Sequence, residues 1–148
     1  MTDPEYMHLA IAQAQAAALR GEVPVGALVV LDDRILAAAG NRTITDCDPT
    51  AHAEIVALRE AARKAENYRL IGASLYVTVE PCAMCAGALV QARVARLVYG
   101  ADEPKGGAVR TCMRVLDSPA LNHRVEIVSG VLAEESVRLL QSFFSERR

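Results

Sequence analysis

The chain has 148 residues, of which 52% are hydrophobic and 23% are charged, and its formal net charge is −2. This composition is typical of a folded chain with a sizeable core and excludes an intrinsically disordered protein. The small negative charge excludes a generally basic nucleic-acid-binding protein, so a polyanionic partner would have to meet a local basic patch. We therefore expect one domain spanning residues 1–148.

The sequence shows no targeting or membrane-spanning segment. No apolar run approaches the roughly 20 residues that cross a bilayer, and the N-terminus lacks the basic and apolar segments of a secretory signal. We expect a cytoplasmic protein with no membrane partner, in which the four cysteines stay reduced. In that compartment a Cys-x-x-Cys pair favours metal binding or redox chemistry over a structural disulfide.

The first predicted element is a helix over residues 4–20. The stretch Thr2-Asp3-Pro4-Glu5 combines a capping side chain, an early proline and a glutamate, and this pattern is typical of a helix start. An alanine-rich segment follows and ends at Gly21. His8 lies on this helix, where we expect a surface or packing role.

A hairpin and a second helix come next. Residues 26–41 contain two apolar runs of strand length on either side of the turn Asp32-Asp33. Residues 48–67 predict a helix capped by Asp48 or Thr50. Three of its apolar residues are spaced to form one buried face: Ile55, Leu58 and Ala62.

Strands and helices alternate through the second half of the chain. The predicted elements are a strand at 74–80, a helix at 82–94, strands at 96–101 and 124–130, and a closing helix at 133–148. A Gly-rich loop and a short helical piece separate the last two strands. The closing helix carries an apolar face: Val137, Leu140 and Phe144. This order predicts an α/β protein with three layers, α/β/α, around a central mixed sheet of about five strands.

One set of residues has the donor types and spacing of a zinc site. Cys82 and Cys85 follow Pro81 and share one face of a helix start, where the thiol pKa is lowered. His52, in the first turn of the 48–67 helix, can supply a third ligand. Three protein ligands leave the fourth tetrahedral position open to water, which is the pattern of a catalytic zinc. Cys47 could instead close that position.

The fourth cysteine has a simpler interpretation. Cys112 lies far along the chain from the other three. We expect it to be a small buried apolar residue.

Glu54 separates a reactive site from an inert one. Side chains two residues apart on a regular helix point about 200° apart, so Glu54 and His52 converge only if His52 lies at the helix boundary. The stretch Asp48-Pro49-Thr50 predicts such a boundary. A carboxylate beside a zinc-bound water can accept its proton and deliver it to a leaving group.

Taken singly, these motifs are weak. His-Ala-Glu alone is common in ordinary amphipathic first turns, and Cys-x-x-Cys alone is only moderately specific. Both in this order, each opening a helix, are strong.

Together, His52-Ala53-Glu54 and Pro81-Cys82-Ala83-Met84-Cys85 resemble the signature of the zinc-dependent nucleobase deaminases. The resemblance is greatest to the bacterial tRNA-specific adenosine deaminases and runs nearly end to end, through "EVPVGA", "GNR", "NYRLIGASLYVTVEPCAMCAGAL" and "FFSERR". It implies a cytidine deaminase-like fold, one Zn²⁺ per subunit and a homodimer. The implied reaction is hydrolytic deamination of adenosine to inosine at the wobble position of a tRNA anticodon stem-loop.

The resemblance also implies roles for individual residues. His52, Cys82 and Cys85 correspond to the zinc ligands, and Glu54 to the catalytic proton shuttle. By the same resemblance, Asn41 and the Ala53 backbone correspond to groups at the flipped base. From the residues themselves we expect Pro81 to bind substrate, and the basic residues Lys105, Arg147 and Arg148 to meet phosphates. Our hypothesis for Glu103 is that it accepts a hydrogen bond from a ribose 2′-hydroxyl.

Two features of the sequence bear on RNA binding. Phe143 and Phe144 can pack in the core or stack on bases, and we favour core packing. The stretch Val109-Arg110-Thr111 stands where the family commonly has small residues, in a loop that should frame the substrate.

Two other functions fit the same motifs. A deaminase of a free nucleobase or nucleoside, such as cytosine, guanine or cytidine, would use the same metal site behind a closed entrance. A non-catalytic zinc-containing RNA-binding module would need no carboxylate at Glu54. The presence of Glu54 therefore argues against the second alternative.

Overall fold

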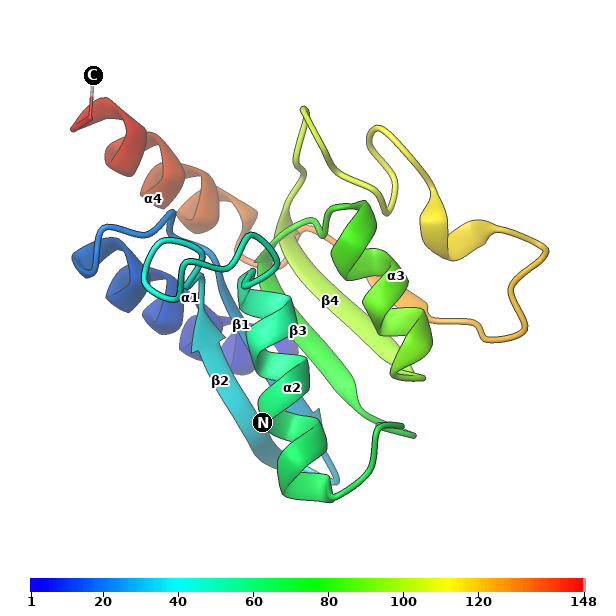
Figure 1. Ribbon diagram of the computed structural model, residues 1–148. Helices are drawn as coiled ribbons and strands as arrows, with labels where there is room; N and C mark the ends of the chain where they lie inside the picture. Colours follow the sequence, from blue (N-terminus) through cyan, green and yellow to red (C-terminus); the bar gives the residue numbers. More distant parts are fainter. Residues whose placement is uncertain (148) are drawn as a thin grey trace.

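A mixed sheet forms the middle layer of the computed structural model, which describes residues 1–147 (Figure 1). The five strands lie in the order β2-β1-β3-β4-β5. Strand β1 is antiparallel to both β2 and β3, whereas β3, β4 and β5 run parallel to one another. The strands are β1 (Gly26–Leu31), β2 (Arg34–Gly40), β3 (Ser74–Val79), β4 (Arg96–Ala101) and β5 (Glu126–Val128).

The predicted hairpin joins β1 to β2. Asp32 and Asp33 have φ angles of 51° and 60°. Two successive residues of positive φ are what a tight hairpin turn between right-twisted strands requires, and Asp is among the residues that tolerate this conformation. The turn is therefore determined by local sequence.

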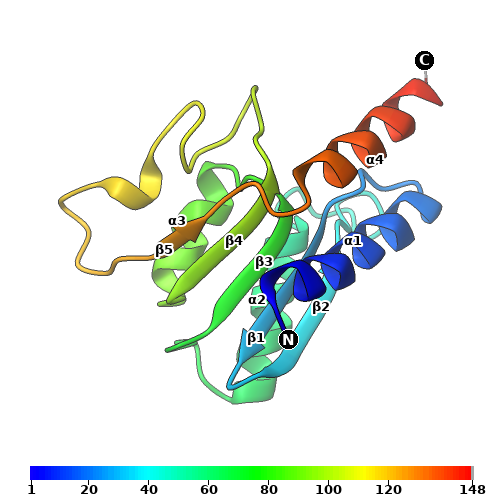
Figure 2. The same cartoon turned by 180° about the vertical axis from the view of Figure 1, so that it is seen from behind.

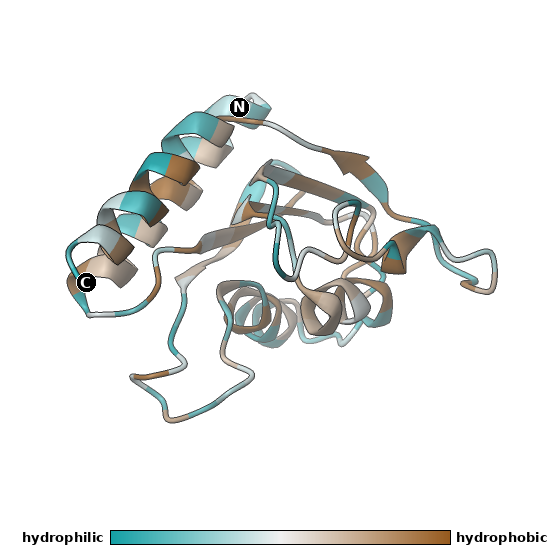
Figure 3. Ribbon diagram, turned by 90° about the horizontal axis from the view of Figure 1, so that it is seen from above, coloured by the Kyte–Doolittle hydropathy of each residue, from teal (hydrophilic) through white to brown (hydrophobic). Residues whose placement is uncertain are grey.

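Two helices cover each face of the sheet (Figures 1 and 2). Helices α2 (Ala53–Ala65) and α3 (Ala83–Gln91) lie on one face, and α1 (Asp3–Leu19) and α4 (Ala133–Ser145) lie on the other. Viewed along the sheet, the hydrophobic strands lie between the two helix layers (Figure 3). The expected α/β/α arrangement with a five-stranded mixed sheet is confirmed.

Helix α1 starts as the sequence predicts. The Thr2 side chain accepts a hydrogen bond from the Glu5 backbone, and the Glu5 carboxylate accepts one from the Thr2 backbone. This capping box satisfies two backbone donors at the helix start. The middle of α1 packs directly on Gly26 of β1. A side chain at this position would collide with the Ala10 carbonyl oxygen, because a Cβ there would lie only 1.9 Å from it.

The second predicted helix begins later than its sequence indicates. Helix α2 starts at Ala53 with His52 as N-cap, whereas the Asp48 carboxylate accepts hydrogen bonds from Thr50 and does not cap it. Its buried face consists mostly of small residues, which allow close approach to the sheet: Ala53, Ala57, Leu58 and Ala61. Of the face predicted from spacing, only Leu58 is buried, and Ile55 and Ala62 are partly exposed.

The predicted apolar face of the closing helix was also wrong. Ser136 and Phe143 of α4 are buried, whereas Val137 and Phe144 are exposed. The Ser136 hydroxyl lies only 3.0 Å from where a Cβ on Gly100 would be. The helix approaches β4 this closely through its small residue, so the bulkier stripe faces outward.

The expected short helical piece is a 3₁₀ helix, η1 (Val115–Asp117), in the long connection between β4 and β5. Cys112 lies in this connection and is exposed, so its expected burial was wrong. Its thiol points to the Pro104 carbonyl oxygen at 3.2 Å. No helix within residues 1–147 combines the length and apolar character needed to cross a bilayer.

Candidate active site

Two helix starts meet at the end of the sheet where β3 finishes. Strand β3 ends at Val79 and is followed by Pro81 and Cys82, after which α3 begins. Helix α2 begins at the same end, directly after His52. Ligand sites of α/β proteins form where parallel strands end, because the loops and helix N-termini that follow them converge there.

His52, Cys82 and Cys85 form a tight cluster. The His52 Nδ1 atom lies 3.6 Å from Cys82 Sγ and 3.5 Å from Cys85 Sγ. A tetrahedral zinc with ordinary Zn–N and Zn–S bonds would hold such a nitrogen and sulfur about 3.6 Å apart. The donor types and their spacing therefore fit Zn²⁺. Cys47 is not in this cluster, and its thiol points to the Ile44 carbonyl oxygen.

Two residues of this cluster occupy helix N-cap positions. His52 and Cys82 have extended backbones, and neither side chain caps its own helix. Helix starts normally have Ser, Thr, Asp or Asn at this position, so both helices lack a side-chain cap, and the imidazole and thiol are free to bind a cation. The partial positive charge of the helix starts favours thiolates beside them.

Contacts within the cluster favour a thiolate at Cys82. Hydrogen bonds from Cys85 and His52 lower the pKa of Cys82 to about 3. The contact with Cys82, together with burial, raises the pKa of the Cys85 thiol. The hydrogen bond to Cys82 also raises the pKa of His52. A divalent cation would displace the protons that these three groups share.

Glu54 lies beside the cluster in the first turn of α2. It is only 4% exposed, and burial raises the pKa of its carboxyl group. The extended backbone of His52, with ψ at 154°, allows the two side chains to converge despite their spacing. A buried carboxyl group of raised pKa can both accept and donate a proton near neutral pH.

A small cavity of about 150 Å³ unites these groups. It lies at the end of β3, next to the starts of α2 and α3. Its lining residues are Val25, Asn41, His52, Glu54, Val79, Glu80, Cys82 and Glu103. Five of these were predicted from the sequence as site residues, whereas Val25, Val79 and Glu80 were not.

Asn41 joins the cavity wall to the start of α2. Its Oδ1 accepts a hydrogen bond from the Ala53 N–H at 2.9 Å, and its Nδ2 donates to the Val23 carbonyl at 3.1 Å. The carboxamide has two N–H groups, so one donor remains beyond the bond to Val23. Ala53 is fully buried, and its N–H is used by Asn41.

Glu80 is the main residue that sequence reasoning missed. It is 3% exposed and receives hydrogen bonds from backbone N–H groups of Glu103, Val109, Arg110 and Thr111, and from the Thr111 hydroxyl. Burial alone would raise the pKa of Glu80, but these donors outweigh it and hold the pKa at about 2. The only sequence signal was a charged residue at the end of an apolar strand.

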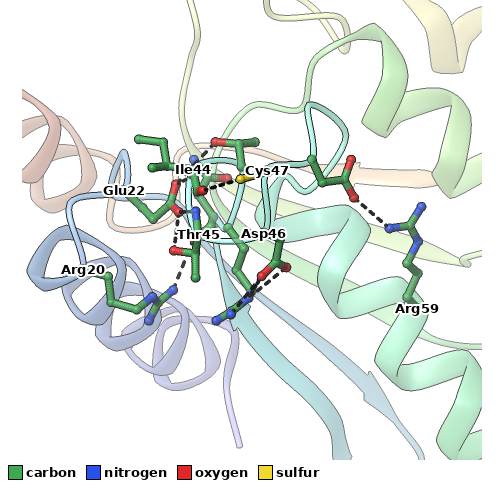
Figure 4. A network of polar contacts seen from close by, with 11 residues as sticks. Arg20, Glu22, Ile44, Thr45, Asp46, Cys47 and Arg59 are labelled. Atoms are coloured by element: carbon green, nitrogen blue, oxygen red, sulfur yellow. Dashed lines mark hydrogen bonds and ion pairs between the residues drawn. The ribbon is translucent and has the colours of Figure 1, made fainter.

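A second buried carboxylate, Glu22, holds the loop before α2. Its Oε2 accepts from the Thr45 N–H at 2.7 Å and the Thr45 hydroxyl at 2.6 Å, and Oε1 accepts from the Ile44 N–H at 3.3 Å (Figure 4). Burial opposes ionisation, yet these donors lower the pKa of Glu22. Within the loop, the Arg42 guanidinium pairs with the Asp46 carboxylate. The loop that follows Asn41 is therefore held by the buried Glu22 carboxylate and by an ion pair of its own.

Basic residues meet farther out, between the loop after β4 and the end of α4. Lys105, Phe144 and Arg147 are among the residues that line a groove of about 700 Å³. Phe143 is buried, and the Arg147 guanidinium lies 3.6 Å from its ring centroid. The predicted contact residue Arg148 lies outside the described residues.

Comparisons with known proteins agree with this geometry. The MafB19-like deaminase family matches residues 1–148. A tRNA-specific adenosine deaminase of Agrobacterium fabrum is 48% identical over 143 residues, covering 97% of this chain and 94% of the relative. The enzyme of the same name from Bacillus subtilis is 48% identical, covering 100% of this chain and 92% of its own.

A solved structure is also similar along most of its length. It comes from studies of A-to-I editing by tRNA:A34 deaminases at the wobble position of transfer RNA. It superposes with a TM-score of 0.89 at 48% identity, covering 92% of this chain and 99% of that chain.

Proposed function

Since the chain belongs to the family of the tRNA-specific adenosine deaminases, we propose that it converts adenosine to inosine at the wobble position of tRNA anticodons in the cytoplasm. The observation that carries the proposal is the buried Glu54 carboxyl group in one cavity with a histidine and a cysteine of the zinc-binding cluster. This pairing is what hydrolytic deamination of a base requires.

His52 Nδ1 and the sulfurs of Cys82 and Cys85 would hold one Zn²⁺ per subunit. A zinc ion bound there would lower the pKa of a water molecule to about 7 and so would supply a nucleophile at neutral pH. The three protein ligands leave one coordination position for that water. Neutral imidazole and two thiolates suit zinc in charge and softness.

Glu54 moves the protons of the reaction. Its carboxylate takes one proton from the attacking water and delivers it to N1 of adenine, while the oxygen bonds to C6. The carboxylate then passes the second proton of that water to the amino nitrogen, and the C6–N6 bond breaks to release ammonia. The products, inosine and ammonia, balance one adenosine and one water.

The cavity wall recognises the base. The second N–H of the Asn41 carboxamide is available to a ring nitrogen of the purine. Ala53 acts through its bond to Asn41, which orients that amide. Pro81 is buried, and its carbonyl accepts the Ala108 N–H, so it supports the wall beside the base.

The outer groove suits the RNA around the flipped base. Lys105 and Arg147 bring positive charge to phosphates. The exposed ring of Phe144 offers a stacking surface. Glu103 lines the inner cavity, where its carboxylate can accept a hydrogen bond from a ribose 2′-hydroxyl. Anticodon bases are already unstacked, so little energy is needed to extrude the target.

A second face of the molecule favours a homodimer. An apolar groove of about 440 Å³ runs between α2 and α3, and its residues include Ile55, Tyr68 and Ala88. Tyr68 is 74% exposed there. A two-fold dimer that buries more than about 1,000 Å² would cover this surface.

Light scattering at micromolar concentration tests the dimer. Tyr68→Asp should yield a monomer, whereas the control Leu19→Asp changes an apolar residue that is 91% exposed on α1 and should remain a dimer. A monomeric wild-type protein would contradict the proposal.

Deamination is tested with zinc-loaded protein and a panel of anticodon stem-loops, free adenosine, cytidine and guanine. We expect inosine only from stem-loops with adenosine at the wobble position, and matched stem-loops with guanosine there serve as the control. Turnover of free bases alone would favour the nucleobase deaminase alternative. Absence of any turnover would favour the non-catalytic module.

A further inference from the structure

We propose that Glu80 is a positioning residue: it holds loop 103–111 in a fixed position relative to the Pro81-Cys82 segment, which carries one of the zinc-binding cysteines. The hydroxyl of Thr111 completes the set of donors around the Glu80 carboxylate. The inference rests on the proposed function, because loop 103–111 begins at the catalytic cavity and its Lys105 lines the RNA groove.

The Glu80 carboxylate acts as the internal anchor of the loop. Its Oε2 accepts backbone N–H groups of Val109, Arg110 and Thr111 at 3.0, 2.8 and 3.0 Å. Its Oε1 accepts the Glu103 N–H at 3.1 Å and the Thr111 hydroxyl. Both ends of the loop are therefore bound to one side chain.

The fit around this carboxylate is tight. A Cβ added to Gly107 would lie 2.4 Å from Glu80 Oε1, so the loop backbone passes directly over the carboxylate. Ala108 and Val109 are fully buried, which is unusual for a loop that borders a substrate site. Buried backbone of this kind needs internal acceptors, and Glu80 supplies them.

The same carboxylate lies next to the metal ligands in the chain. Glu80 is followed by Pro81, whose carbonyl accepts the Ala108 N–H at 2.9 Å, and then by Cys82. The loop and the zinc-binding segment therefore share one rigid junction. Movement of Glu80 would change the distance between the metal ligands and the side chains of Glu103 and Lys105.

A carboxylate is required here on chemical grounds. All five groups around it are donors, and an ionised carboxylate is an acceptor at both oxygens. A glutamine would bring its own N–H groups against some of those donors.

The loop also has one contact that does not involve Glu80 or the cavity. The Arg110 guanidinium donates to the Ser129 hydroxyl at 3.1 Å on the outer side of the loop.

Thr111 offers the sharpest test, because Thr111→Val removes only the hydroxyl while Thr111→Ser keeps it. We expect Thr111→Val to raise the KM for a wobble-adenosine stem-loop about tenfold, with kcat changed less than threefold, since a hydrogen bond to a charged group is lost. Amide hydrogen exchange at Val109 and Arg110 should become about tenfold faster. Thr111→Ser should match the wild type in both measurements.

Glu80→Gln should show the same changes to a greater degree. Zinc content should stay near one per chain in the Thr111 variants. If Glu80→Gln does not fold, the two Thr111 variants decide the matter.

Three results would overturn the proposal. The first is a Thr111→Val variant whose amide exchange and KM equal those of the wild type. The second is an equal change of these two quantities in Thr111→Ser and Thr111→Val. The third is loss of zinc from Thr111→Val, which would assign Glu80 to metal retention. A wild-type protein inert toward every stem-loop would refute the proposed function instead. Hydrogen exchange in the loop would still report on Glu80 in that case.

Discussion

Asn41 holds the start of α2 through its hydrogen bonds, and the proposed function gives it a second role at the substrate base; two substitutions separate these roles. Asn41→Ala removes both the bond from the Ala53 N–H and the bond to the Val23 carbonyl. The Ala53 N–H is then left unpaired in a fully buried position, which costs about 1–3 kcal/mol, and the lost bond to Val23 adds about 0.5–1.5 kcal/mol. We expect the free energy of unfolding to fall by the sum of these two terms, about 1.5–4.5 kcal/mol.

Asn41→Asp keeps the acceptor for Ala53 and loses only the amide donors. The carboxylate at the start of α2 is favourable, but it faces the Val23 carbonyl without a proton to share. The cost in stability should be about 1–2 kcal/mol, clearly less than for Asn41→Ala. Both variants should lose about ten- to hundredfold in kcat/KM on the stem-loop, because both lack the donor to the base.

Urea unfolding of the zinc-saturated proteins measures the loss in the free energy of unfolding. On heating, the unfolding midpoint of a chain of this size should fall by about 2–4 °C per kcal/mol lost. Saturating zinc in every sample keeps the contribution of metal binding constant. Unfolding of Asn41→Ala within 0.5 kcal/mol of the wild type would refute the hydrogen-bond assignment. Wild-type kcat/KM in Asn41→Asp would refute the role of the amide at the base.

Three further predictions concern other residues. Glu54→Ala should retain one zinc and a normal fold while losing deamination, because Glu54 moves protons and does not hold the metal; metal analysis and a stem-loop assay check this, and zinc loss would contradict it. Asp3→Asn should lower stability by about 1 kcal/mol at pH 7, because the hydrogen bond from Arg96 lowers the pKa of Asp3 below its unfolded value. The ionised Asp3 stabilises the fold above about pH 4, and this contribution is lost as the pH falls through the folded-state pKa. The free energies of unfolding of the two proteins, measured with urea, should therefore converge at low pH. A stability difference that does not change with pH would exclude the ion pair as the source of that difference. Glu103→Asn should narrow the RNA-over-DNA preference by about 1–2 kcal/mol in kcat/KM on matched hairpins, and an unchanged ratio would leave Glu103 without a role at the 2′-hydroxyl.

The clustering of His52, Glu54, Cys82 and Cys85 could be predicted from the sequence because these residues lie in two short local motifs. Histidine and glutamate fall within one helix start, and the two cysteines within another, so local geometry brings each pair together. The hairpin turn at Asp32 and the capping box at Thr2 are likewise decided by neighbouring residues. Alternating strands and helices were sufficient for the layer arrangement.

Contacts between distant parts of the chain could not be predicted in this way. Glu80 takes its donors from residues 23 to 31 positions away, and Glu22 from residues 21 to 23 positions away, so neither role leaves a local pattern. Each looks in the sequence like an ordinary charged residue beside an apolar strand. Only the folded chain shows that both carboxylates are buried and hold the two walls of the cavity.

Helix orientation was decided by packing rather than by periodicity. Phe143 and Phe144 differ by about 100° around α4, and the spacing of apolar residues fits either face. The close approach of Ser136 to Gly100 selects the face with Phe143, and this leaves Phe144 in the groove with Lys105. The sequence determined which groups can react, because reactivity depends on residue type and near neighbours. The tertiary structure decided which surface surrounds them, because that depends on which small residues allow two elements to approach.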